Sequence, residues 1–293
     1  MKILITGSKG QLGNELQEII KSGRAEIGEV SDAIKESNII ALDIDELDIT
    51  NLTQVKSKVN DLKPDVVINC AAATNVDGCE SNKGFALKVN SIGPRNLAIT
   101  CEKVGAKLVQ VSTDYVFSGA SDKSLTEYDL PAANSTYGKT KLLGENYVRE
   151  FCSKYFIVRT AWLYGYVGHN FVYTMRKLGK DKDTINVVND QRGNPTHAND
   201  LAYHILKLIE TEEYGVYHCT GKGECTWYDF AKMIIELSGE KCEVKPCTSE
   251  EYKTPAKRPE YSSLDNMMLR NTVGDEMRDW KDAIKSFVDK LDN

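Results

Sequence analysis

Lys2-Ile3-Leu4-Ile5-Thr6-Gly7-Ser8-Lys9-Gly10-Gln11-Leu12-Gly13 is the stretch that decides the fold. Its apolar beginning predicts a buried strand, and Leu12, Leu16 and Ile19 then recur at helical spacing up to Gly23. Strand, glycine-rich loop and helix in this order are typical of the first unit of a parallel α/β sheet.

The glycines of this loop have separate roles in a dinucleotide site. Gly7 allows a sharp turn, Gly10 lets the backbone approach a pyrophosphate, and Gly13 lets the helix pack close to the strand. The helix N-terminus offers N–H groups and a positive dipole to the phosphates. An ordinary strand-to-helix turn is the alternative, but the glycine spacing favours a dinucleotide site. The predicted cofactor-binding loop contains Gly7, Lys9, Gly10, Gln11, Leu12 and Gly13.

Strand and helix alternate along the chain up to residue 165. Apolar runs at 38–42, 65–70, 107–111 and 155–160 predict further strands, with helical patterns between them. This alternation predicts an α/β fold with a doubly wound, Rossmann-like parallel sheet. Residues 24–38 are polar and predict a loop or short insertion.

The pattern changes after residue 165, where most segments lack the strand–helix–strand order. A strand at 215–219 returns to the sheet, and the other segments predict a cap over its carboxyl edge, where ligands bind in such folds. Two units are expected: a dinucleotide-binding domain of residues 1–165 plus about 196–221, and a smaller C-terminal substrate-binding subdomain of about 166–195 and 222–293.

Composition and charge exclude several classes of protein. The net charge of −6 argues against nucleic acid as the main partner. No apolar run reaches the ~18 residues of a transmembrane helix, and the short N-terminal run lacks the features of a signal peptide. The eight cysteines form no C-x-x-C pair, and no histidine lies at metal-ligand spacing from them. We expect a cytoplasmic protein with reduced thiols, no metal site and no membrane partner.

Tyr137 and Lys141 begin a predicted helix, where a spacing of four residues places them on one face. A nearby ammonium favours the phenolate and moves the tyrosine pKa down from ~10. Thr113, at the end of a predicted strand, can share a substrate oxygen with the phenol. The three residues predict proton transfer at a carbonyl or alcohol. Because Tyr-x-x-x-Lys also occurs on solvated helix faces, this prediction depends on the dinucleotide site upstream.

Two residues give conflicting signals about the cofactor. Asp43 ends the second predicted strand, where an acid accepts hydrogen bonds from the adenosine ribose and disfavours a 2′-phosphate. Lys9 stands in the glycine loop, where a cation can reach such a phosphate. NADH and NADPH therefore both stay open, and Asp45 competes with Asp43 for the ribose. Asp48 and Ile49 are placed against the adenine.

Several motifs occur in a characteristic order along the chain. After the third predicted strand, Ala71, Ala72 and Ala73 allow a cofactor to lie against the backbone. The motifs are Gly10-Gln11-Leu12-Gly13, Asn69-Cys70-Ala71-Ala72, Ser112-Thr113-Asp114-Tyr115-Val116-Phe117, Tyr137-Gly138-Lys139-Thr140-Lys141-Leu142-Leu143-Gly144-Glu145, Arg159-Thr160-Ala161-Trp162-Leu163-Tyr164-Gly165 and Trp227-Tyr228-Asp229-Phe230-Ala231. Together they resemble the extended short-chain dehydrogenase/reductases, and among them the dTDP-4-dehydrorhamnose reductase family.

The resemblance implies an NAD(P)H-dependent reductase. Its substrate would be dTDP-4-dehydro-β-L-rhamnose, whose 4-keto group is reduced to give dTDP-L-rhamnose. Tyr137 would donate the proton, Lys141 would hold the nicotinamide ribose and lower the Tyr137 pKa, and Thr113 would hydrogen-bond the carbonyl. The expected substrate-binding residues are Thr74, Asn75, Val76, Thr113, Asp114, Trp162, Asn170, Arg192 and Arg258.

Two other functions are weighed against this one. A reductase or epimerase of the same fold could act on another nucleotide sugar. A non-catalytic, dinucleotide-binding regulatory subunit would have no chemical need for Thr113, Tyr137 and Lys141 together. For the assembly, a homodimer is considered. No ligand spacing in the sequence supports a metal ion at a dimer contact.

Overall fold

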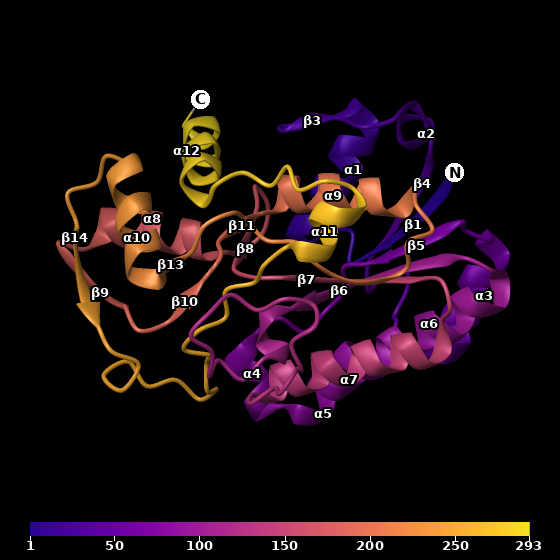
Figure 1. Cartoon of the computed structure of the whole chain (residues 1–293), viewed down its shortest axis with the longest axis horizontal. Coiled ribbons are helices and arrows are strands. Elements are labelled where there is room, and N and C mark those ends of the chain that lie inside the picture. Colours follow the sequence, from indigo (N-terminus) through magenta and orange to yellow (C-terminus); the bar gives the residue numbers. More distant parts are fainter. Residues whose placement is uncertain (293) are drawn as a thin grey trace.

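The computed structural model describes residues 1–292, and its centre is a sheet of six parallel strands (Figure 1). The strand order is β12-β7-β6-β5-β1-β4. These strands are β1 (Lys2–Thr6), β4 (Asn38–Leu42), β5 (Val66–Asn69), β6 (Lys107–Thr113), β7 (Tyr155–Thr160) and β12 (Gly215–His218). The predicted doubly wound parallel sheet is confirmed.

The direction of winding reverses at β1. The chain leaves β1 to form β4 on one side and then crosses to β5 on the other side. Gly7 follows β1 with a φ of +64°, and a Cβ there would lie 2.7 Å from the backbone nitrogen of Ala71. The loops after β1 and β5 therefore meet at the switch point, which is where open α/β sheets bind ligands.

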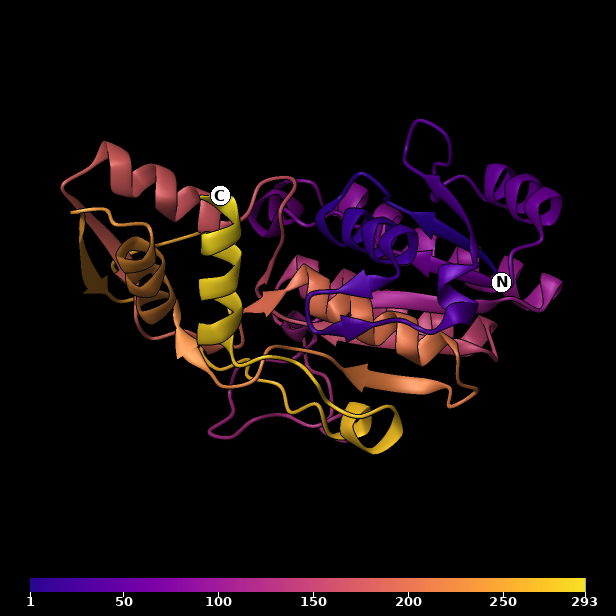
Figure 2. The same ribbon diagram turned by 90° about the horizontal axis from the view of Figure 1, so that it is seen from above.

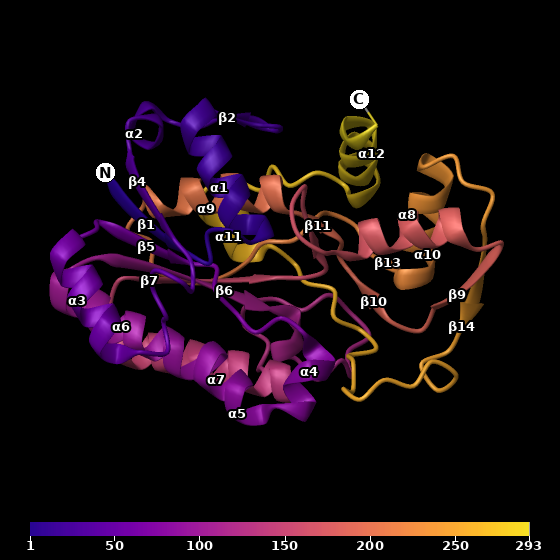
Figure 3. The same ribbon diagram turned by 180° about the vertical axis from the view of Figure 1, so that it is seen from behind.

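Helices cover both faces of the sheet (Figures 1 and 3). Because side chains alternate along a strand, Ile3 and Ile5 pack on one face and Leu4 on the other. The first face carries α1 (Gln11–Ser22), α9 (Ala198–Ile209) and α11 (Met267–Thr272). The second face carries α3 (Leu52–Leu62), α6 (Gly93–Val104) and α7 (Thr136–Phe151).

A loop and then a series of short helices follow β5. It comprises α4 (Val76–Ser81), α5 (Lys83–Leu87), a π-helix at Lys88–Ile92 and then α6. The π-helix directly precedes α6, which carries Pro94 in its first turn. Asn90 of the π-helix donates to the carbonyl of Ala73 and accepts from its amide, so it fixes the chain beyond β5.

A second group of elements lies beside one end of the sheet (Figures 1 and 2). It has its own apolar core, in which Val172, Ile185 and Phe230 pack together. Its elements are α8 (Phe171–Asp181), α10 (Trp227–Leu237), α12 (Trp280–Leu291), and the parallel pair β9 (Thr184–Val188) and β14 (Glu243–Cys247). Thr226 caps α10 in a capping box with Asp229, as its place before an apolar run predicts.

Short strand pairs connect these parts. They are β8 (Leu163–Tyr164) with β11 (Thr196–His197), and β10 (Arg192–Gly193) with β13 (Cys225–Thr226). The polar 24–38 segment forms a hairpin of β2 (Arg24–Ala25) and β3 (Gly28–Glu29) followed by α2 (Asp32–Lys35).

A partly buried ionic network holds the hairpin. Glu26 accepts hydrogen bonds from Arg278 at 3.0 Å and from Tyr166 at 2.6 Å, and Arg278 also binds Asp200 of α9. This network links the hairpin to α9 and to the segment that leads into α12. None of the helices within residues 1–292 combines the length and the apolar character needed to cross a bilayer.

Candidate active site

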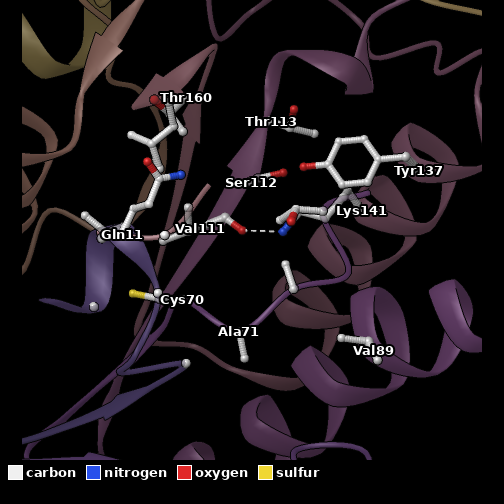
Figure 4. A pocket seen from close by; sticks show the side chains of 18 of the residues that line it. Gln11, Cys70, Ala71, Val89, Val111, Ser112, Thr113, Tyr137, Lys141 and Thr160 are labelled. Carbon is white, nitrogen blue, oxygen red and sulfur yellow. Dashed lines mark hydrogen bonds between the residues drawn. The ribbon is translucent and has the colours of Figure 1, made fainter. Parts of the chain in front are cut away.

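A cleft of about 750 Å³ opens at the carboxyl ends of the sheet strands (Figure 4). It brings together most of the residues predicted for the site, from segments far apart in the sequence. The predicted residues that line it are Gly7, Lys9, Gly10, Gln11, Leu12, Gly13, Asp43, Asp48, Ile49, Ala71, Ala72, Thr74, Val76, Thr113, Asp114, Tyr137, Lys141 and Trp162.

The glycine loop leaves the N-terminus of α1 open to the cleft. Gly10 occupies the cap position, and no side chain there caps the helix. Helix N-terminal N–H groups need an acceptor, and a phosphate is a suitable one. A Cβ at Gly13 would lie 2.5 Å from the carbonyl oxygen of Gly7, so only glycine lets α1 start this close to β1. These features fit a dinucleotide pyrophosphate.

An acidic side chain is fixed at the other end of the glycine loop. Asp43, directly after β4, accepts hydrogen bonds from the backbone amides of Lys9 at 2.9 Å and Ile44 at 2.8 Å. The Lys9 ammonium instead pairs with Asp45 at 3.1 Å, and both of these side chains are exposed. A carboxylate suited to ribose hydroxyls and an exposed cation suited to a phosphate therefore lie side by side.

Tight packing brings α7 to the end of β6. Ser135 caps α7 by accepting from the amide of Gly138 at 3.1 Å. A Cβ at Gly138 would lie only 2.1 Å from the carbonyl oxygen of Tyr115, so the first turn of α7 rests directly on the loop after β6. As a result Tyr137 and Lys141 face the end of β6 (Figure 4).

Burial sets the pKa of both residues on α7. Burial raises the pKa of Tyr137, and a hydrogen bond with Thr113 acts in the opposite direction. The expected lowering of this pKa by Lys141 is therefore wrong for this arrangement. The Lys141 ammonium donates to the carbonyl oxygen of Val111 at 2.7 Å, and burial lowers its pKa to about 8 although Glu145 raises it. At neutral pH Tyr137 is a protonated phenol and Lys141 is a cation.

Thr113 and Asp114 form a hydrogen-bonded pair next to the phenol. The Thr113 hydroxyl donates to a carboxylate oxygen of Asp114 at 2.9 Å and accepts from the amide of Tyr115 at 3.2 Å. Burial raises the pKa of Asp114 to about 6, while hydrogen bonds from Ser262 and Thr113 oppose this shift. The Thr113 hydroxyl must turn its proton away from Asp114 in order to donate to a substrate carbonyl.

A buried ion pair lies behind Lys141. Glu145, one turn further along α7, accepts hydrogen bonds from Arg159 of β7 at 2.7 and 3.0 Å and from Ser112 of β6 at 2.6 Å. Arg159 in turn contacts His218, whose pKa burial lowers to about 3, so this imidazole is neutral. The network ties α7 to three adjacent strands directly below the reacting residues.

Both arginines that were expected to bind the substrate are paired with carboxylates of the protein instead. Arg258 pairs with Asp77 at 2.9 and 3.2 Å, and half-exposed Arg192 lies 3.4 Å from Glu224. Each cation is thereby satisfied by a carboxylate rather than directed into the cleft.

Three other residues expected at the site form hydrogen bonds within the protein instead. Asn170 caps α8 and donates to the side chain of Gln11 at 3.0 Å, and Asn75 caps α4. The backbone of Ala73 is occupied by Asn90. None of these three residues, nor Arg192 or Arg258, is among the residues that line the cleft in the described chain.

Some residues of the cleft were not predicted from the sequence. Ser112 and Thr160 stand at the ends of paired strands, so their position after an apolar run was an available signal. Trp227 comes from α10 in the second group of elements, and no local pattern indicates that it reaches the cleft. Within residues 1–292, no group of three or more histidine, cysteine or acidic side chains is arranged to hold a metal ion.

Comparison with known proteins identifies the family. Residues 1–293 match the family described as RmlD substrate binding domain. The dTDP-4-dehydrorhamnose reductase of Streptomyces griseus is 40% identical, over 96% of this chain and 91% of the relative. The chain belongs to the dTDP-4-dehydrorhamnose reductase family. The resemblance predicted from the sequence motifs is therefore confirmed.

Solved structures of the same family share the whole fold. The dTDP-4-dehydrorhamnose reductase of Clostridium acetobutylicum is 51% identical with a TM-score of 0.94, and all of both chains is covered. The Bacillus anthracis dTDP-4-dehydrorhamnose reductase in complex with NADP is 42% identical with a TM-score of 0.92, covering 99% of each chain. The second structure shows that a member of this reductase family binds NADP.

Proposed function

We propose that this chain reduces the 4-keto group of dTDP-4-dehydro-β-L-rhamnose with NADH or NADPH to give dTDP-L-rhamnose, a precursor of cell-surface polysaccharide. Family membership supports the reaction. The observation that carries it in this chain is the arrangement of Tyr137, Lys141 and Thr113 in the same cleft as the glycine loop. A regulatory, non-catalytic protein has no need of this trio.

The reduced nicotinamide supplies a hydride to carbon 4 of the sugar. Tyr137, buried and protonated at neutral pH, donates its phenolic proton to the oxygen of the former ketone. Lys141 carries a positive charge at neutral pH and stabilises the phenolate that is left behind. Thr113 donates a hydrogen bond to the carbonyl oxygen as negative charge develops there.

The cofactor-binding roles follow the placement of the cleft residues. We assign the pyrophosphate to the N-terminus of α1, the adenosine ribose to Asp43 and the adenine to Asp48 and Ile49. Lys141 also holds the nicotinamide ribose. We further propose that the sheet and its helices bind the dinucleotide. The substrate-binding side would then be formed by about 166–195 and 222–293, apart from α11, which packs on the sheet.

The cellular setting and assembly are proposals as well. All eight cysteines of the described chain are free thiols, which suits the reducing cytoplasm. For the assembly we propose a homodimer, and light scattering of the purified protein at several concentrations tests it. A mass of one chain at all concentrations would refute the dimer.

Oxidation of NADH and NADPH in the presence of freshly made dTDP-4-dehydro-L-rhamnose tests the reaction. Tyr137→Phe should lower turnover by roughly 100-fold or more, because the proton donor is lost, while binding of the cofactor stays intact. Tyr147→Phe, on the same helix but outside the cleft, is the matched control and should keep full activity. Near-normal turnover in Tyr137→Phe would remove this residue from its role as the acid.

Another 4-keto nucleotide sugar in the same assay tests the second candidate. Oxidation with that sugar, and none with dTDP-4-dehydro-L-rhamnose, would assign the chain to a different sugar. Cofactor binding without oxidation of any sugar would instead favour the regulatory role.

A further inference from the structure

Two tryptophans from different parts of the chain form one wall of the cleft. Trp162 follows β7 of the central sheet, and Trp227 is the first residue of α10. Their rings stack with centroids 3.6 Å apart and an angle of 8° between the planes. Both side chains are half-buried and line the cleft. The stack therefore joins the sheet to the second group of elements at the site itself.

Trp162 is held in an unfavourable backbone conformation. Its φ of +47° lies in the left-handed region, which a bulky residue rarely occupies. Gly193 leaves space for the indole of Trp162, because a Cβ at position 193 would lie 2.7 Å from the ring atoms Cε2 and Nε1. Such a conformation persists only where its surroundings enforce it, and Trp227 is one of the groups that do so.

Trp227 is itself fixed rather than loosely packed. The Thr226 hydroxyl accepts from the amide of Asp229 and donates to its carboxylate at 2.7 Å, which sets the first turn of α10. The ring of Phe171 packs on Trp227 with centroids 4.5 Å apart. Trp227 is therefore held in a fixed position, and it also lines the cleft.

The stack lies on the substrate side of the reacting residues. In the sheet Thr113 of β6 is paired with Thr160 of β7, and Trp162 stands two residues beyond Thr160. Asp43, assigned to the adenosine, follows β4 at the opposite edge of the sheet. A sugar whose carbon 4 lies at Tyr137 would extend toward the tryptophans. A 6-deoxy sugar presents a methyl group and C–H bonds there, and aromatic rings provide an apolar surface for them.

We propose that Trp227 is a specificity-determining residue that, with Trp162, forms the apolar wall on which the 6-deoxy sugar packs. This inference rests on the proposed function and deepens it. The wall favours a methyl group at carbon 6 over a hydroxymethyl group, because a hydroxyl packed on the carbon surface of the rings would lose its water without gaining a hydrogen-bond partner there. An apolar surface of this type discriminates by roughly 10- to 200-fold.

Kinetics of Trp227→Ala and Trp227→Phe provide the first test. Trp227→Ala should raise the KM for dTDP-4-dehydro-L-rhamnose at least tenfold, while the KM for the nicotinamide cofactor stays within about twofold, and Trp227→Phe should lie between it and the natural protein. Trp280→Phe is the matched control, because Trp280 packs against Phe230 away from the cleft. An unchanged sugar KM in Trp227→Ala would overturn the proposal, and so would an equal rise in both KM values.

Equilibrium binding tests the same wall without turnover. In Trp280→Phe only Trp162 and Trp227 remain, since the chain has three tryptophans. Binding of dTDP-L-rhamnose should change their fluorescence, whereas dTDP alone should not. dTDP-L-mannose, which carries a hydroxyl at carbon 6, should bind at least tenfold more weakly than dTDP-L-rhamnose, and this preference should vanish when Trp227→Ala is added.

The two proposals fail in different ways. A fluorescence change equal for dTDP and dTDP-L-rhamnose, or a preference for the methyl group that survives Trp227→Ala, would overturn the wall. Absence of turnover by the natural protein would refute the proposed function, and the binding measurements would still decide whether the tryptophans contact a deoxysugar.

Discussion

Lys141→Met should abolish the reductase activity and yet leave the fold at least as stable as that of the natural protein. The Lys141 ammonium is buried, and burial lowers its pKa from the ordinary 10.5 to about 8. The folded state therefore disfavours the charged form of this side chain. Methionine has a similar length and no charge, so it removes this penalty together with the cation.

The size of the effect follows from the pKa. One pKa unit corresponds to about 1.4 kcal/mol, so the shift to about 8 corresponds to roughly 3 kcal/mol of destabilisation at neutral pH. Methionine leaves the carbonyl of Val111 without its hydrogen bond, which costs about 1–3 kcal/mol. The variant should thus be equal to the natural protein, or up to about 2 kcal/mol more stable.

The pH dependence gives the sign of the effect independently. The folded pKa lies below the unfolded one, so between pH values of about 8 and 10.5 the unfolded chain binds more protons and the natural protein gains stability as the pH rises. Methionine has no such titration. The advantage of Lys141→Met should shrink by roughly 1 kcal/mol between pH 7 and pH 9.

Urea unfolding of both proteins at the two pH values measures this difference. Lys139→Met, an exposed lysine on the same helix, is the control and should change stability little at either pH. A loss of about 3–5 kcal/mol in Lys141→Met, as expected when a favourable buried ion pair is broken, would refute the reasoning. A difference that does not change with pH would refute it as well.

Three other substitutions test separate parts of the site. Asp43→Ala should narrow any preference for NADH over NADPH, as the ratio of the two KM values will show; an unchanged ratio would assign the ribose to another group. Glu145→Gln should lower the free energy of unfolding by about 3–5 kcal/mol in urea titrations, because Arg159 keeps a buried charge without its partner, and a loss below about 1 kcal/mol would contradict this. Gly138→Ala should lower both stability and turnover, since its Cβ would collide with a main-chain carbonyl, whereas Gly84→Ala, with open space around it, should keep both; matching melting temperatures for the two variants would show that α7 can shift.

The central sheet was predictable because its signals are local. Four of its first five strands, namely β1, β5, β6 and β7, are largely apolar and buried, and β4 at the edge is an apolar run of intermediate burial; the helices between them carry their own start and stop signals. Gly23 ends α1 in the left-handed conformation, and the Asn51 side chain caps α3. These features depend on neighbouring residues, so periodicity and capping are enough to find them.

The second group of elements was less predictable because its pairing is distant. β9 pairs with β14, which begins at Glu243, almost sixty residues later, and no local pattern indicates which strand is its partner. α8 was missed inside a mixed, polar stretch. Its stability comes from packing in the apolar core that it shares with α10 and α12, and this packing is a tertiary property.

The residues of the site also fall into those that local patterns predict and those that depend on distant contacts. Residues directly after strands were placed correctly in the cleft, because the carboxyl ends of parallel strands meet at one edge. The pairing of Arg258 with Asp77 and the contact of Trp227 with Trp162 depend on how distant segments fold together, so no local sequence pattern predicts them. Likewise, the pKa of Tyr137 is set by burial, which a motif alone does not reveal.

The ion pair between Glu26 and Arg278 has a consequence for how the protein is made. The two residues are separated by 252 positions in the chain, so the hairpin is synthesised long before the arginine that holds it. At ~5–20 residues per second, a ribosome needs roughly 10–50 s to cover that distance. During this time the Glu26 carboxylate lacks its guanidinium partner, although Tyr166 can donate to it once that residue has been made. The hairpin is therefore among the first segments to be synthesised and among the last to gain all of its contacts. A chain released before Arg278 is made lacks this ion pair.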